Sequence, residues 1–451
     1  MAPTAHNPGR YQDFQPRRIH RAGQTRTLYR SLGPLLSEGS TAVLRRILGT
    51  STRPSRQSPP EDFPDFGATV RTTGIEHGTL VNAAPLKVLG TMGETNPASC
   101  YRIEYISGDS AGRAITATGG VLFSKQPWPH GPRPVVAIAP STQGVAAHCD
   151  PSHTCAIGLN VFYDKPFDAI LAYELPVILW FLAKGVDVIF IDYPRDPIAG
   201  IQYYCDSIAA AKSLFDAVLA ASDLGISPEA PLGLWGFSQG GGATGWAAQL
   251  NKYAPTVTPR AAVVGAPPTD LFEVLRTVDG GLLSGVIAYA VAGLCASTPE
   301  LYAEIMPTLN TRGTREVLNN VASCAGGTLL LSGYRHSSTW TTSGKTLDDV
   351  LDDLPTVLAE FQRQKLGAIA PKMPVLLWGA KHDDVIPIQP LRDLRDAWTE
   401  LGADITWYES SAPQLPGHTG LNHFGPYFRH LGHYSGWLLD HLVESTPLHR
   451  A

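Results

Sequence analysis

The feature that most constrains this chain is a serine set between glycines, after a short apolar run and before a run of small residues. Residues 232–250 read LGLWGFSQGGGATGWAAQL. This pattern predicts a strand, a tight turn that carries Ser238, and a helix that lies close to a sheet. Side chains two positions before or after the serine would collide with neighbouring backbone, which explains the glycines. The turn would expose the Ser238 hydroxyl and direct N–H groups of the helix toward an oxyanion.

The surroundings of this serine carry more weight than the G-x-S-x-G pattern itself. Because 44 of the 451 residues are glycine, the pattern alone fits a glycine-rich turn equally well. A second apolar run, AAVVGA at 261–266, follows at the spacing of a strand–helix–strand unit. A nucleophilic serine in this setting also requires an acid and then a histidine later in the chain.

Two aspartates follow the next strong strand signal, PVLLW at 374–378. A carboxylate that orients a histidine must be held in place, and a strand end provides this. We predict that Asp383 is the acid, since it stands four residues before Pro387 in a D-x-x-x-P ending. Asp384 is the alternative, and it could instead be a loop carboxylate or a helix cap.

The base is expected in the segment that follows the acid. This segment offers His418 in PGHTG and His423 in LNHFGP. We predict His423, because it lies at the start of the closing helix, with His418 as the alternative. A histidine can take and return the serine proton at neutral pH. Three further histidines fall within the predicted C-terminal helix and are expected to be structural: His430, His433 and His441.

Two backbone N–H groups are expected to bind the oxyanion. Gln239, directly after the serine, would supply one of them. The other would follow the apolar strand PVVAIA at 134–139. We predict Ser141 for this second donor, with Thr142 as the alternative.

Strands and helices alternate along most of the chain, which predicts an α/β fold with a mainly parallel central sheet. Residues 100–107 and 115–125 are expected to form an antiparallel entry pair. Further strands are expected at 186–192 and 403–408, and helices at 174–184, 205–221 and 391–401.

Residues 272–370 lack this alternation and are helical in pattern, which predicts a helical segment before the acid-bearing strand; that it forms a cap or lid is implied by the family resemblance described below. Within it, the 14-residue apolar run 282–295 is too short to span a bilayer, where about 20 residues are needed. We expect a buried cap helix that can also line an acyl-chain tunnel. The predicted domains are an arm at 1–60, a core at 61–271 and 371–451, and the cap at 272–370.

The charge distribution separates the first 60 residues from the rest. The net charge of −5 argues against a nucleic-acid partner. The first 60 residues hold ten arginines, no lysine and two acids, Asp13 and Glu38. A basic arm, a peripheral anchor to anionic lipid and a targeting segment all fit this composition. No apolar stretch of the kind found in secretory signals follows, so we expect a flexible arm with affinity for membrane surfaces.

The six cysteines fit no metal-binding spacing, and none forms a C-x-x-C pair. The predicted chemistry needs neither a metal ion nor an organic cofactor.

Several segments resemble the secretory lipase family of α/β-hydrolases, the lipase A type. They are STQGVAAHCDPS at 141–152, GFSQGG at 236–241, GAPPTDL at 265–271, DDVIP at 383–387 and the closing NH…WLLD pattern. The resemblance covers roughly residues 60–446. It implies an α/β-hydrolase fold with a helical cap, hydrolysis of triacylglycerols or other carboxylic esters, and a secreted or envelope-associated protein. It also implies a disulfide from Cys149 to a cap cysteine, Cys324 or Cys295.

The function predicted from these residues is ester hydrolysis through an acyl-enzyme on Ser238, with His423 as base and Asp383 as its partner. An acyltransferase would use the same residues with an alcohol in place of water. A lipid-binding envelope protein with a degenerate site is the alternative outside enzymes.

Overall fold

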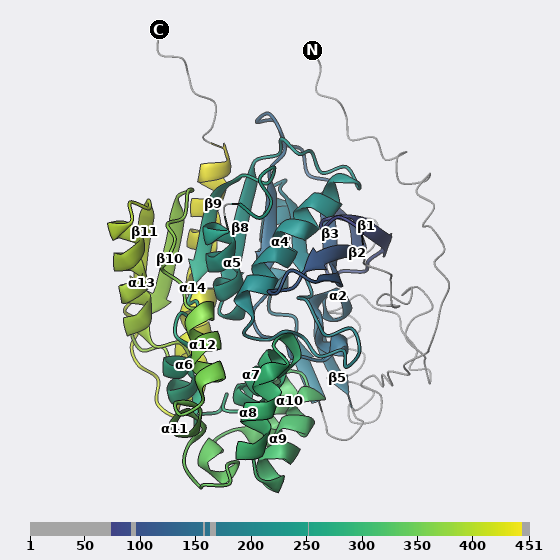
Figure 1. The fold of residues 1–451 in the computed structure, drawn as a ribbon. Helices are drawn as coiled ribbons and strands as arrows, with labels where there is room; N and C mark the ends of the chain where they lie inside the picture. The colour runs from purple at the N-terminus through teal and green to yellow at the C-terminus, as the bar shows by residue number, and fades with distance from the viewer. Residues whose placement is uncertain (1–73, 92–95, 157, 163–167, 251, 444–451) are drawn as a thin grey trace, which may run out of the picture.

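The computed structural model describes residues 74–91, 96–156, 158–162, 168–250 and 252–443, so the predicted arm at 1–60 lies outside the described part. A nine-stranded sheet forms the centre, in the order β1-β2-β3-β7-β4-β8-β9-β10-β11 (Figure 1). Its strands are β1 (Leu80–Pro85), β2 (Ala98–Gly108), β3 (Ala114–Ser124), β4 (Val135–Ala139), β7 (Asp187–Ile191), β8 (Leu232–Phe237), β9 (Pro259–Gly265), β10 (Val375–Ala380) and β11 (Ile405–Ser410). A separate antiparallel pair consists of β5 (Leu159–Phe162) and β6 (Asp168–Leu171).

The sheet is antiparallel at its entry and parallel over the rest. Strands β1, β2, β3 and β7 pair antiparallel in that order, and β7, β4, β8, β9, β10 and β11 pair parallel. Every residue of β4, β7, β8 and β10 is buried. Parallel strands are covered on both faces, which is why these four strands are nearly continuous apolar runs. The predicted antiparallel entry and mainly parallel sheet are both confirmed.

Helices cover both faces of the sheet. Figure 1 shows α4 (Ser207–Ser222) and α5 (Gln239–Gln249) in front of it and α14 (Leu421–Val443) behind. On one face of the sheet, alanines of α4 and α5 pack in a common hydrophobic core. Leu394 and Trp398 of α13 (Ile388–Glu400) belong to the same core. The opposite core holds Phe181 of α3 (Leu175–Ala183) and Tyr434 of α14. Small side chains let α5 approach closely, since a Cβ on Gly241 would lie 2.1 Å from the Gly265 carbonyl oxygen.

A run of helices lies between β9 and β10, where the sequence predicted an insertion. These helices gather below the sheet in Figure 1. They are α6 (Leu271–Val278), α7 (Val286–Ser297), α8 (Glu300–Ile305), α9 (Thr311–Val321), α10 (Ala325–Ser332), α11 (Leu347–Leu351) and α12 (Pro355–Gln364), with 3₁₀ turns η3 (Met306–Thr308) and η4 (Ser337–Thr339). Two further short helices, η2 (Ala147–Cys149) and α2 (Pro151–Thr154), follow β4.

The apolar run at 282–295 is not helical from its first residue. Helix α7 begins at Val286, and the four residues before it form a turn. The Leu282 N–H donates to the His418 carbonyl oxygen at 2.9 Å, and the Ser284 hydroxyl donates to the Ser332 carbonyl oxygen at 2.6 Å. These tertiary bonds hold the turn outside the helix. None of the helices that the structure describes is long and apolar enough to cross a membrane.

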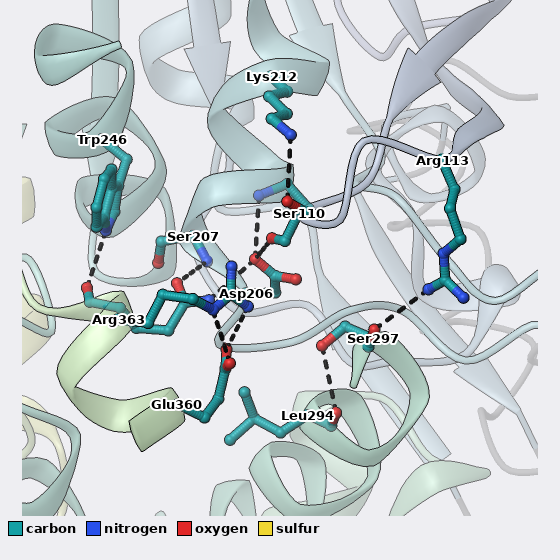
Figure 2. Close-up of polar contacts among 12 residues, drawn as sticks. Ser110, Arg113, Asp206, Ser207, Lys212, Trp246, Leu294, Ser297, Glu360 and Arg363 are labelled. Atoms are coloured by element: carbon teal, nitrogen blue, oxygen red, sulfur yellow. Dashed lines mark hydrogen bonds and ion pairs between the residues drawn. The ribbon is translucent and has the colours of Figure 1, made fainter. Parts of the chain in front are cut away.

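The last helix of the insertion is bonded to the core where α4 begins (Figure 2). The Gln364 side chain accepts from the Ser207 N–H at 2.9 Å and donates to Asp206 Oδ1 at 3.1 Å. The Trp246 indole N–H donates to the Gln364 carbonyl oxygen at 2.8 Å. Asp206 also caps α4 by accepting from the Ala209 N–H. The C-terminal end of α12 is therefore fixed to α4 and α5, in front of the sheet.

A disulfide joins the loop after β4 to the start of α10. Cys149 pairs with Cys324, whereas Cys295 is free. Beside the bridge, Gly144 forms an isolated antiparallel β-bridge with Cys324, and the Ala325 N–H donates to the Gln143 carbonyl oxygen at 2.8 Å. The expected link from Cys149 to the insertion is confirmed, and its partner is Cys324.

Candidate active site

Ser238 lies on the turn between β8 and α5 with a backbone that few residues other than glycine adopt. Its φ is 58° and its ψ is −120°. Its N–H donates to the Gly265 carbonyl oxygen at 2.9 Å, and its carbonyl oxygen accepts the first hydrogen bond of α5, from Gly242. A positive φ at a serine costs conformational energy, so the surrounding contacts must hold the turn in place. The hydroxyl is consequently presented at the carboxyl end of β8.

The two flanking glycines are required by contacts with backbone atoms. A Cβ on Gly236 would lie 2.0 Å from the Gly240 carbonyl oxygen, and a Cβ on Gly240 would lie 1.9 Å from the Ala139 carbonyl oxygen. Both distances are far inside van der Waals contact, and backbone oxygens cannot move aside as a flexible side chain can. The close approach of α5 to the end of β4 thus depends on Gly240.

Asp383, which follows β10, and His423, in the first turn of α14, form a buried hydrogen-bonded pair. Asp383 follows β10, and its Oδ1 accepts from the N–H groups of Val385 and Ile386, both at 2.8 Å. The His423 Nδ1–H donates to Asp383 Oδ2 at 2.7 Å, and both side chains are only 1% exposed. Nε2 of His423 is buried and has no hydrogen-bond partner among the described residues. One ring nitrogen of His423, Nδ1, is therefore bound to the carboxylate, and the second, Nε2, remains available to accept a proton.

Aromatic rings hold the imidazole of His423 from one side. Phe237, the residue before Ser238, stacks on His423 with ring centroids 4.6 Å apart. Tyr427 stacks on the same phenylalanine at 4.3 Å, and Trp378 at 5.3 Å. The strand that carries the serine and the helix that carries the histidine are packed together by these rings.

The two alternative residues take other positions. Asp384 Oδ2 accepts from the Gly420 N–H at 2.9 Å and from the Asn422 side-chain amide at 3.2 Å, so it fixes the loop before α14. His418 lies earlier in that loop with a φ of 49°. The ring of His418 packs near Gly281, where a Cβ would lie 2.7 Å from its Nδ1. The structure brings His423 to Asp383, and His418 faces the insertion.

This difference predicts unequal effects of two matched substitutions. We expect Asp383→Asn to lower kcat for p-nitrophenyl butyrate by about 10⁴-fold, because an amide no longer holds His423 in the required tautomer. Asp384→Asn keeps an oxygen that can accept from Gly420, so we expect a loss of no more than about tenfold. Steady-state kinetics of both variants at pH 7 measures this. A larger loss in Asp384→Asn than in Asp383→Asn would contradict the assignment.

Of the two N–H groups predicted to bind the oxyanion, the structure supports that of Gln239 but not that of Ser141. Gln239 is the first residue of α5, where a helix N–H has no partner within the helix. Ser141 is fully buried, and its N–H donates to Glu174 Oε1 at 2.6 Å. The structure therefore does not support Ser141 as a donor, because its N–H is already bound to a carboxylate. Thr142, the alternative, lines the same cavity as Ser238 and Gln239.

A cavity of about 650 Å³ lies beside Ser238 and His423. Many of the residues that line it are apolar side chains of the helical insertion, including Leu275 of α6, Val291 of α7 and Leu329 of α10. No aspartate, glutamate, lysine or arginine of the described residues lines it. The site can therefore bury a long uncharged group next to the serine.

One group of described residues has the chemistry of metal ligands: His148, Cys149, Asp168 and Cys324. Both sulfur atoms are joined in the disulfide, so neither is a thiolate that could bind zinc. His148 Nε2 lies 3.0 Å from Asp168 Oδ2 as part of this cluster. That no metal or cofactor takes part stays a prediction.

Comparisons with known proteins show which family and fold the chain shares. The family model described as "Secretory lipase" matches residues 167–449. The chain is 35% identical to a protein of Mycobacterium tuberculosis (strain CDC 1551 / Oshkosh) named "probable inactive lipase", over 74% of each chain. It is 24% identical to lipase A of Moesziomyces aphidis, over 85% of this chain and 82% of that one. Candida antarctica lipase A in its closed state matches with a TM-score of 0.72 at 18% identity, over 87% of this chain and 88% of that one. These likenesses confirm the predicted α/β-hydrolase fold.

Proposed function

Because the chain belongs to the secretory lipase family, we propose that it hydrolyses carboxylic esters of lipids through an acyl-enzyme formed on Ser238. The observation that carries the proposal is the buried His423–Asp383 pair, because His423 lines the same cavity as Ser238 and its Nε2 has no hydrogen-bond partner among the described residues. A histidine held in one tautomer by a carboxylate is the base that a serine nucleophile needs.

The acyl group of the ester is transferred first to Ser238 and then to water. The Ser238 oxygen bonds to the ester carbonyl carbon while His423 takes its proton, and the same proton then goes to the leaving alcohol. Asp383 stabilises the positively charged imidazole. The N–H groups of Gln239 and Thr142 stabilise the oxyanion of each tetrahedral intermediate. Water then attacks the acyl-enzyme, with His423 again as base, and releases the carboxylic acid.

The apolar cavity supports a lipid ester as substrate. Each methylene group of an acyl chain gains about 0.8 kcal/mol when it leaves water for an apolar site. We propose that residues 272–370 act as the cap that supplies this site, over a core of residues 61–271 and 371–451. Three side chains that line the cavity are also well exposed, Leu171, Leu421 and Phe428. Such exposed apolar groups favour contact with a lipid surface. The family's description as secretory supports export of this chain.

Product analysis distinguishes hydrolysis from acyl transfer and from binding alone. We expect the full chain, given tributyrin and 1 M sorbitol in water, to release butyric acid as its main product, because water is far more abundant than the alcohol. Quantitative mass spectrometry of butyric acid and sorbitol butyrate measures the ratio. Mostly sorbitol ester would favour an acyltransferase. Saturable binding of a fatty ester with no cleavage would favour the lipid-binding alternative.

A further inference from the structure

Three consecutive residues after β4 are each bonded to a different part of the chain. The Pro140 carbonyl oxygen accepts from the Tyr193 hydroxyl. Glu174 Oε1 accepts from Ser141 twice, from its N–H at 2.6 Å and from its hydroxyl at 2.5 Å. The Thr142 hydroxyl lies 2.8 Å from that of Tyr204. The loop that would supply the second oxyanion donor is therefore held at every residue.

Glu174 is an unusual residue for this position. It precedes α3 and is 2% exposed. Its side-chain hydrogen-bond partners within the described residues are neutral donors: Ser141, and the Tyr427 hydroxyl at 3.4 Å from Oε2. Burial raises the pKa of the Glu174 carboxyl. A buried acid with no cation beside it among the described residues is costly for the fold, so packing alone does not account for Glu174.

The same carboxylate also contacts the helix that carries the base. Tyr427 is four residues after His423 on α14, one turn along the helix. The ring of Tyr427 stacks on Phe237, which in turn stacks on His423 and precedes Ser238. Glu174 thus bonds to the loop that contains Thr142 and also to Tyr427. Through Phe237, the ring of Tyr427 is part of the aromatic packing around His423.

We propose that Glu174 is a positioning residue that orients the Thr142 N–H toward the oxyanion, an inference that rests on the proposed function. The peptide group between Ser141 and Thr142 carries that N–H. Glu174 holds the residue before this peptide group by accepting from Ser141. Tyr204 holds the residue after it, through a hydrogen bond with the Thr142 hydroxyl. A donor held in this way needs no reorganisation when the oxyanion forms, which is the source of its catalytic effect.

The test compares Glu174→Gln with Asp187→Asn, a matched change at another buried acid. Asp187 lies at the amino end of β7, away from the serine, and accepts from the Ser124 N–H at 2.8 Å. Burial raises the pKa of Asp187 to about 7. For p-nitrophenyl butyrate, we expect Glu174→Gln to lower kcat by about 3- to 10-fold with KM within twofold. Glutamine keeps an oxygen that accepts from Ser141 but loses the charge that strengthens both bonds, so the oxyanion donor is held less firmly. Asp187→Asn should keep kcat within about twofold.

A second readout separates positioning from folding. A trifluoromethyl ketone forms a tetrahedral oxyanion adduct on the serine, whereas the matching alcohol binds without one. We expect Glu174→Gln to weaken the ketone by the same factor as kcat and to leave the alcohol unchanged. If Glu174→Gln fails to fold, Ser141→Ala removes one of the two donors to the carboxylate and is expected to lower kcat by about 3- to 10-fold.

The possible outcomes are distinct. Wild-type kcat in folded Glu174→Gln, or in Ser141→Ala when the first variant does not fold, would overturn the role of Glu174 alone. Equal losses of kcat and of thermal stability in Glu174→Gln and Asp187→Asn would assign Glu174 a structural role and would also overturn it. A wild-type chain that cleaves no ester would overturn the proposed function, and this inference with it.

Discussion

We expect Ser238→Ala to lower kcat for p-nitrophenyl butyrate by about 10⁶-fold, while the protein stays folded. The reason is that alanine removes the oxygen atom that attacks the ester carbon in the first step of the proposed reaction. Residual hydrolysis about 10³-fold above the rate in water would remain, because the oxyanion donors and the cavity still act on a bound ester. Stopped assays at high enzyme concentration, with circular dichroism as the folding check, measure both quantities.

A second serine gives a matched control for this substitution. Ser213 is fully buried on α4 and bonds to the Tyr105 hydroxyl at 2.8 Å. Ser213→Ala removes the same hydroxyl group from the core and is expected to change stability more than kcat. Wild-type kcat in Ser238→Ala would contradict the assignment of the nucleophile.

Replacing His423 by alanine is expected to have an effect of the same size, about 10⁵- to 10⁶-fold on kcat. The variant lacks the proposed base that takes the proton of Ser238, and Asp383 loses the ring to which it is hydrogen-bonded. The double variant Ser238→Ala/His423→Ala should be no slower than either single variant, because the two residues act as one unit. Kinetics of the two single variants and the double variant tests this.

The matched control for His423 is His418→Asn. Asparagine tolerates the positive φ of His418 better than most residues, so the loop should keep its shape. We expect kcat within about twofold of wild type, since the ring of His418 faces the insertion rather than Asp383. A full loss of activity in His418→Asn, with activity kept in His423→Ala, would move the base to His418.

The sequence predicted those parts of the candidate site that follow from local rules. Ser238, Asp383 and His423 each follow a strand or open a helix, and neighbouring parallel strands bring their carboxyl ends to one edge of the sheet. The glycines around Ser238 were predictable for the same reason, because the strand-to-helix turn sets the contacts of Gly236 and Gly240.

The parts that sequence reasoning missed depend on contacts between distant segments. Ser141 was predicted as an oxyanion donor because it follows the strand end, but Glu174, 33 residues later, binds its N–H. The start of α7 was placed four residues early, because the bonds of the preceding turn come from Ser332 and His418. Cys324 and Cys295 were equal candidates for the disulfide until the position of α10 beside the β4 loop was known.

Covalent labelling identifies the nucleophile, which we propose to be Ser238. The full chain is treated with a p-nitrophenyl alkylphosphonate, digested, and mapped by peptide mass spectrometry. We expect one stoichiometric adduct on Ser238, formed at wild-type rate in His418→Asn and at a strongly reduced rate in His423→Ala. An adduct on another residue, or no adduct under conditions in which the chain cleaves esters, would contradict this proposal.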